Sequence, residues 1–231
     1  MNNLQTSELS GPFASLASFS GVAACLLFVG SATAQNLITD GSFESPVVAA
    51  AAGYEVFTPS AGSLPGWSIV GTEVAVVGSS FVEAGVAFVA ESGNQWMDLS
   101  GLGAPSLTNG IIQSVATTSG LQYQLSFYLG SAYTGSGPYL SPTLDLSLNG
   151  GPRVSYTNSN IVTNGLMNWQ FFTTTFTATS ATSSIAFYYG ATGASVWAVG
   201  LDNVSMTVVP APGALAAFAA VAAAGRRRRM R

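Results

Sequence analysis

The heptapeptide Gln122-Tyr123-Gln124-Leu125-Ser126-Phe127-Tyr128 decides the fold class, because polar and apolar side chains alternate along it. Successive side chains of a β-strand point to opposite faces of a sheet, so a period of two gives one buried and one wet face. The segment 144–148, Leu-Asp-Leu-Ser-Leu, has the same period, and Asn149-Gly150 directly follows it. This dipeptide is a type I′ hairpin signal, since both turn positions need a positive φ. We therefore expect antiparallel strands on both sides of this turn.

Short β-branched and aromatic runs of this kind continue over residues 35–208, separated by Gly, Ser, Thr, Asn and Pro every eight to twelve residues. No segment of ten or more residues shows the 3.6-residue period of an amphipathic helix with capping residues. One wet face and one buried face per strand suit two antiparallel sheets packed on each other. We predict an all-β domain over 35–208, an antiparallel jelly-roll β-sandwich.

The composition excludes several kinds of function. The chain has no His, and its one Cys is Cys25, in an N-terminal apolar stretch. A domain without His or Cys has no zinc site of the usual ligand types, no Ser-His-Asp triad, no Cys nucleophile and no disulfide. Within 35–208 the single cation Arg153 faces nine carboxylates, which argues against nucleic-acid binding. We expect Arg153 to pair with Asp145 across the hairpin.

The N-terminal residues 1–34 have the pattern of a secretory signal peptide. An apolar run from Phe13 to Gly30 is followed by the motif Ala32-Thr33-Ala34, which predicts cleavage by signal peptidase after Ala34. The segment before the run departs from the pattern, since it lacks Lys and Arg and contains Glu8. Two alternatives stay open: a buried helix of the fold, and lipidation at Cys25. The favoured prediction is a signal helix that export removes.

The C-terminal residues 209–231 have three parts: a Pro-containing motif, an apolar span and a basic cluster. The motif is Val209-Pro210-Ala211-Pro212-Gly213, the span covers the twelve residues 214–225, and the cluster is Arg226-Arg227-Arg228-Arg229. Twelve residues of helix cover about 18 Å, short of the roughly 30 Å hydrocarbon core of a bilayer. By the positive-inside rule, we expect the Arg cluster to stay at the cytoplasmic face of the membrane. We therefore expect a short apolar helix that associates only transiently with a membrane.

This tail resembles the PEP-CTERM sorting signal of Gram-negative bacteria, although Ala211 stands where the commonest form has Glu. The resemblance implies recognition of the Pro motif by an exosortase and removal of the tail during delivery. It also implies a final location at the cell surface or in the extracellular matrix, reached through transient anchoring in the inner membrane.

The domain opens with Asn36-Leu37-Ile38-Thr39-Asp40-Gly41-Ser42-Phe43-Glu44 and closes with Gly200-Leu201-Asp202-Asn203-Val204-Ser205-Met206. Together with Leu64-Pro65-Gly66-Trp67 and the segment 92–100, these motifs resemble galactose-binding-domain-like jelly rolls and family 4/9 carbohydrate-binding modules. The resemblance implies that the first and last strands are adjacent, which would bring Glu44 and Asp202 together. One structural Ca²⁺ commonly joins the ends in such folds. Ca²⁺ takes six to eight oxygen ligands, and acids without a counter-charge favour a cation; the alternative is that both carboxylates cap turns.

Aromatic side chains are the candidates for a glycan site, because sugars stack their C–H faces on aromatic rings beside amide hydrogen-bonding groups. Trp96 follows the amide side chains of Asn94 and Gln95, and Trp197 precedes the closing motif. Tyr133 and Tyr139 lie in a long loop rich in Gly, Ser and Pro. The predicted ligand contacts are Trp96, Trp197, Tyr133, Tyr139 and Asn94.

These observations predict an exported, non-catalytic β-sandwich that binds polysaccharide at the cell surface or in the exopolysaccharide matrix. Its partners in export would be signal peptidase and an exosortase. One alternative is a purely structural matrix protein without a discrete ligand. Another is a glycosidase or lyase with two catalytic carboxylates, which would need an acid pair flanking a cleft.

Overall fold

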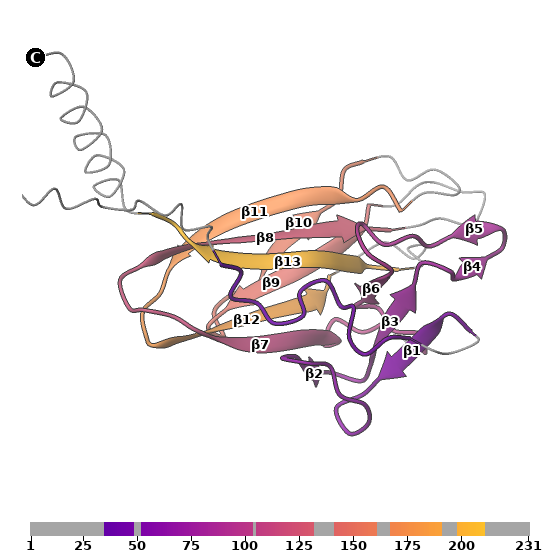
Figure 1. The fold of residues 1–231 in the computed structure, drawn as a ribbon, viewed down its shortest axis with the longest axis horizontal. Coiled ribbons are helices and arrows are strands. Elements are labelled where there is room, and N and C mark those ends of the chain that lie inside the picture. The colour runs from indigo at the N-terminus through magenta and orange to yellow at the C-terminus, as the bar shows by residue number, and fades with distance from the viewer. Residues whose placement is uncertain are drawn as a thin grey trace, which may run out of the picture. The chain divides into compact units, whose positions relative to one another are not determined.

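The computed structural model describes residues 35–48, 52–103, 105–131, 141–160, 167–190 and 198–210 (Figure 1). The helices predicted at the two ends of the chain, within 1–34 and 211–231, lie outside these residues. The described residues contain no helix that is long and apolar enough to cross a membrane. Their strands, in chain order, are β1 (Tyr54–Phe57), β2 (Ser68–Val70), β3 (Val74–Gly78), β4 (Val82–Glu83), β5 (Val86–Ala87), β6 (Gln95–Asp98), β7 (Gly110–Ala116), β8 (Gln122–Gly130), β9 (Thr143–Leu148), β10 (Val154–Thr157), β11 (Gln170–Thr177), β12 (Thr182–Tyr189) and β13 (Gly200–Val208).

The strands form two main antiparallel sheets, which confirms the predicted all-β sandwich. The first sheet has the order β1-β3-β6-β13-β8-β11, and the second has the order β10-β9-β12-β7-β2. β4 and β5 pair separately as a short hairpin. In Figure 1 the axes of the long strands β7, β8, β11 and β12 are roughly aligned, with paired strands pointing in opposite directions.

The core between the sheets is built from the apolar face that the heptapeptide in β8 predicts. Tyr123, Leu125 and Phe127 are at most 2% exposed, whereas Gln122 and Gln124 are exposed. The ring of Phe127 joins both sheets, because its centroid lies within 6 Å of three other rings: Tyr156 at 5.2 Å, Phe172 at 5.7 Å and Phe187 at 5.1 Å. Aromatic pairs at these separations add stability beyond the apolar area that they bury.

The hairpin signal is also confirmed. Asn149 and Gly150 have φ values of 53° and 69°, and the amide of Gly151 donates to the carbonyl of Leu148 at 2.9 Å. The turn leads from β9 towards β10, which pairs with β9 in antiparallel register.

The first described segment lies along β13, so the two ends of the domain are adjacent. The amide of Leu37 donates to the carbonyl of Met206, and the amide of Val204 donates to the carbonyl of Gly41, both at 2.8 Å. We call this contact between the first described segment and β13 the seam. The side chain of Asn36 adds to it, since its Oδ1 accepts from the Met206 amide at 2.9 Å and its Nδ2 donates to the Val204 carbonyl at 3.2 Å. The opening and closing motifs are therefore adjacent, as expected. The expected adjacency of the first and last strands is wrong, because the opening motif forms no strand and the first strand, β1, is separated from β13 by β3 and β6.

A second apolar cluster covers part of the outer face of the first sheet, over β3 and β6. It joins outward side chains of these strands, such as Val77 and Trp96, to Val86 and Phe88 from the β5 region. With this cluster on one side and the core, which contains Met97, on the other, all four residues of β6 are buried.

Candidate functional site

The outer face of β8, β11 and β13 is a continuous surface of hydroxyl and amide groups, which we call the polar face. Strand register aligns its rows: Thr173 of β11 and Ser205 of β13 both lie opposite Ser126 of β8. The opposite side of each strand points into the core, so these side chains face outward. The polar face consists of Gln122, Gln124, Ser126, Tyr128, Phe171, Thr173, Thr175, Thr177, Ser205 and Thr207, none of which is charged. Asp202, which lies opposite Tyr128 on the same side of the sheet, is entirely buried and does not reach this surface.

An aromatic pair lies at one end of the polar face. Phe171 is 53% exposed, which is unusual for a ring in a regular strand, and it lies opposite Tyr128 across the ladder. The two ring centroids are 5.1 Å apart, with the ring planes inclined by 56°. Tyr128 therefore supports one side of the Phe171 ring, and the exposed side remains available for contact with a ligand.

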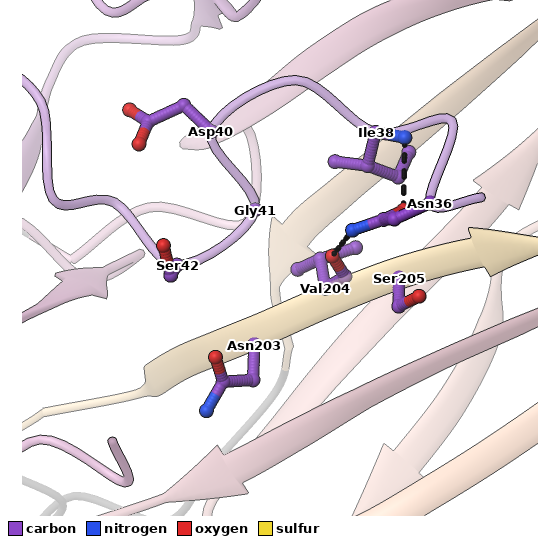
Figure 2. Close-up of a pocket in the computed structure, with 8 residues that line it drawn as sticks. All are labelled: Asn36, Ile38, Asp40, Gly41, Ser42, Asn203, Val204 and Ser205. Carbon is purple, nitrogen blue, oxygen red and sulfur yellow. Dashed lines mark hydrogen bonds between the residues drawn. The ribbon is translucent and has the colours of Figure 1, made fainter. Parts of the chain in front are cut away.

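A groove of about 420 Å³ adjoins the polar face, between the first described segment and β13 (Figure 2). β13 has an irregular register between Asp202 and Ser205, and Asn203 has a φ of 48° there. Figure 2 shows Asn203 and Ser205 on β13, across from Ser42. Ser205 belongs to both the groove and the polar face. The groove is lined by Asn36, Ile38, Asp40, Gly41, Ser42, Asn203, Val204 and Ser205.

Asp40 belongs to the groove by its backbone, while its carboxylate points away from β13 (Figure 2). Burial raises the pKa of Asp40, although the backbone amides of Ser45 and Glu44 lower it in part. Its Oδ2 is buried and has no hydrogen-bond partner among the described residues. The walls of the groove are thus polar but present no carboxylate.

Glu44 and Asp202 both bind the backbone of the loop that leads into β6. Asp202 Oδ2 accepts from the amides of Glu91 at 2.9 Å and Ser92 at 3.4 Å. Glu44 Oε1 accepts from the amides of Asn94 at 2.8 Å and Gln95 at 3.0 Å. Both carboxylates therefore bind backbone amides of the same loop. This is the arrangement expected from the alternative to a metal site, in which the two carboxylates cap turns.

Among the described residues, the acidic side chains are too few at any one place to form a calcium site without backbone carbonyls. Ca²⁺ needs six to eight oxygens around one point, and the described part of the chain contains no group of three or more acidic, His or Cys side chains that could hold a metal ion. Asp202 is entirely buried, and this burial raises its pKa to about 7, with the Glu91 carboxylate adding to the rise. The calcium ion stays a prediction from the sequence.

The single cation of the described residues has a different partner from the one expected. The guanidinium of Arg153 lies over the ring of Tyr188, 3.6 Å from its centroid, and Nη1 donates to the carbonyl of Leu107 at 2.6 Å. Asp145 instead accepts from the hydroxyl of Ser155 at 2.6 Å. The expected pairing of Arg153 with Asp145 is wrong, because the ring of Tyr188 on β12, two strands away from β10, and the carbonyl of Leu107 hold the guanidinium.

Residues 36–207 match the family described as "Protein of unknown function (DUF642)". The chain belongs to the DUF642 family. The match covers both ends of the domain, including the seam between the first described segment and β13, so the whole sandwich is the family's unit.

Solved structures similar to this DUF642 chain share little sequence with it. A structure described as "CBM4 structure and function" has 15% identity and a TM-score of 0.38, over 74% of this chain and 99% of that chain. TmCBM61 in complex with β-1,4-galactotriose has 17% identity and a TM-score of 0.42, over 76% and 100%. A family 35 carbohydrate-binding module from Clostridium thermocellum has 15% identity and a TM-score of 0.39, over 66% and 98%. No curated protein matches the chain.

The structure corrects one predicted ligand contact. Trp96 is 0% exposed, and its Nε1 donates to the carbonyl of Phe88 at 2.9 Å. It packs in the second apolar cluster and offers no ring face to a sugar, because the β4–β5 region covers it. Asn94 is exposed, and its backbone amide is bound by Glu44.

The other predicted site residues lie mainly outside the described part of the DUF642 chain. Of the sorting motif, Val209 and Pro210 are described. The residues outside are Trp197, Tyr133, Tyr139, Ala32, Ala34, Ala211, Pro212, Gly213, Arg226, Arg227, Arg228 and Arg229.

The sequence reasoning missed Phe171 and the Thr residues that follow it. The sequence does contain a signal for an outward-facing row, because Phe171, Thr173 and Thr175 alternate with apolar Phe172 and Phe176. However, the pair Phe171-Phe172 gives no sign of which ring is exposed. Only the ladder with β8 shows that Phe172 packs into the core and Phe171 lies outside it.

Proposed function

We propose that this DUF642 domain is a non-catalytic module that binds neutral polysaccharide on the polar face. The observation that carries the proposal is an uncharged surface of amides and hydroxyls that ends in the exposed ring of Phe171. Sugar hydroxyls exchange hydrogen bonds with such groups, and sugar C–H faces pack on aromatic rings. A flat sheet face suits an extended chain better than a single small molecule, which would favour a concave pocket.

The placement of the carboxylates supports a binding role over hydrolysis. A glycosidase needs two carboxyl groups about 5–9.5 Å apart on either side of the scissile bond. The polar face has none, and Glu44, Asp98 and Asp202 are engaged with backbone amides elsewhere. We therefore keep a carboxylate glycosidase as the less favoured alternative, and a structural matrix protein without a ligand as the other.

A Phe171→Ala variant tests this proposal. We expect the domain to bind at least one of the neutral polysaccharides xylan, galactan, mannan and β-glucan in calorimetry. Phe171→Ala should weaken that binding about tenfold, which corresponds to roughly 1.4 kcal/mol, because the ring is lost while the fold keeps its core. Salt should have little effect, since no charge on the polar face is available for screening.

The matched control is Val154→Ala, which truncates another exposed apolar side chain, on β10 of the second sheet. It should bind like the wild-type protein. Repeating the titration with EDTA tests whether the predicted calcium ion supports binding. If no polysaccharide binds in either condition, the structural alternative replaces this proposal, and release of reducing sugar would favour the glycosidase.

We also propose that the domain is exported and sorted to the cell surface or extracellular matrix by an exosortase. The proposal is supported by the features of 1–34 and 209–231 described above. In a host with an exosortase, the mature protein should begin at Gln35 and lack the Arg cluster. Intact-mass measurement with and without the exosortase checks this, and an uncleaved chain in both hosts would contradict it.

A further inference from the structure

A small pocket lies at the outer face of the first sheet, away from the polar face, and we call it the aromatic pocket. Its volume is about 40 Å³, which is room for one or two groups the size of a water molecule. A sugar ring is too large for it. The side chains that matter here are Tyr54, Phe81, Glu83, Phe88, Trp96 and Asp98.

The rings around the aromatic pocket touch one another in a chain. The centroid of Phe81 lies 5.5 Å from that of Tyr54 and 5.2 Å from that of Phe88, both in edge-on geometry. Phe88 and Trp96 are nearly parallel, with centroids 6.5 Å apart. An aromatic lining attracts cations, because the face of each ring carries negative charge density.

Two carboxylates complete the lining. Asp98, on β6, is only 3% exposed, and its Oδ1 accepts from the Ser100 amide at 2.9 Å, the Ser100 hydroxyl at 2.5 Å and the Val199 amide at 3.2 Å. None of these bonds involves Oδ2. Glu83, on the β4–β5 hairpin, supplies the second carboxylate and is half-buried.

The described residues offer no cation to these acids. They contain one cationic side chain, Arg153, and it is held over Tyr188 in the second sheet. A buried carboxylate without a counter-charge is costly. Burial accordingly raises the pKa of Asp98 to about 7, with a smaller contribution from the Glu73 carboxylate. A cation from outside the protein would remove this cost.

We propose that the aromatic pocket binds an organic ammonium group, either a primary amine or a methylated amine. The rings contact its C–H and N–H groups, Asp98 and Glu83 supply the opposite charge, and the volume limits the ligand to a head group. A free small amine and an amine carried on a polysaccharide share this chemistry. The site is separate from the polar face, so it does not depend on the proposed binding of neutral polysaccharide.

The test is calorimetric titration of the domain at about pH 8 with methylammonium and dimethylammonium, and with methanol as a neutral probe of similar size, since the volume of about 40 Å³ admits only such small groups. We expect at least one ammonium ion to bind about tenfold or more tightly than methanol. Equal binding of the charged and neutral probes would overturn the proposal. A glucosamine oligosaccharide forms the second arm: binding tighter than that of the free ions identifies a polymer-borne amine, and weaker binding identifies a small amine as the ligand.

Three variants locate the site. Glu83→Gln should weaken ammonium binding several-fold and Asp98→Asn about tenfold, because each removes one negative charge from the lining. The control Glu55→Gln removes an equal charge from an exposed residue of β1 beside Tyr54 that does not line the pocket, and it should bind normally.

Wild-type affinity in both Glu83→Gln and Asp98→Asn would overturn the assignment. If Asp98→Asn fails to fold, Glu83→Gln still decides, since its side chain lies on a short outer hairpin. Phe171→Ala should leave ammonium binding unchanged, so failure of the polysaccharide proposal and failure of this one are distinguishable.

Discussion

An Asp98→Asn variant is expected to be more stable than the wild-type protein at about pH 8, by on the order of 4 kcal/mol. The side chain is 3% exposed, and burial raises its pKa from 3.8 to about 7. At pH 8 the folded protein must therefore keep a buried negative charge that the unfolded chain exposes to water. Asn keeps an oxygen acceptor for Ser100 and Val199 and carries no charge.

The sign of the pH dependence follows from proton binding. Between about pH 4 and 7 the folded state holds a proton on Asp98 that the unfolded state has lost, so stability falls as the pH rises through this range. Asp202, with a pKa also raised to about 7, adds to the same slope. The wild-type protein should thus be more stable at pH 5 than at pH 8, and Asp98→Asn should flatten the dependence.

Urea unfolding monitored by Trp fluorescence at pH 5 and pH 8 measures both effects. Asp145→Asn is the matched control, because that carboxylate is only half-buried and accepts from a Ser hydroxyl. It should change the free energy of unfolding little at either pH. Equal stability of the wild-type protein at the two pH values would refute the raised pKa of the buried acids.

Short sequence patterns predict those features of this fold that depend only on neighbouring residues, namely the buried face of a strand and the type of a hairpin turn. The alternation in the heptapeptide of β8 needs only the pleat of a strand, and it fixes which side chains enter the core. The dipeptide Asn149-Gly150 needs only its own backbone preferences, and both residues have the expected positive φ. The adjacency of the opening and closing segments came from a resemblance that covers both motifs together.

The candidate site depended on contacts between distant segments, which local patterns do not contain. Trp96 resembles a surface aromatic in its polar neighbourhood of Asn94 and Gln95, yet the β4–β5 region covers it. Phe171 resembles half of a buried pair, yet its partner in the ladder places it outside. With so few cations available, Glu44 and Asp202 are satisfied by backbone amides of one loop, which no spacing of acidic residues predicts.

The groove depends on close backbone contact at Gly41, so we expect Gly41→Ala to lower the free energy of unfolding strongly. A Cβ at this position would lie 2.1 Å from the carbonyl oxygen of Val204 and 3.0 Å from its carbonyl carbon. Both atoms are backbone, so a rotamer change cannot relieve the clash. The same residue accepts the Val204 amide through its carbonyl, at 2.8 Å. The first described segment must therefore move off β13.

We expect Gly41→Ala to lower the free energy of unfolding by about 3 kcal/mol, since overpacking in a tight contact costs roughly 1–3 kcal/mol and seam hydrogen bonds are lost as well. Gly103→Ala is the control, because its new Cβ meets only the Glu73 side chain, at 3.2 Å, which can shift. Urea unfolding compares the two. Amide hydrogen exchange should also show faster exchange at Leu37 and Val204 in Gly41→Ala, whose amides donate across the seam. Unchanged protection there, together with wild-type stability, would mean that the seam tolerates a Cβ and that the groove does not depend on glycine.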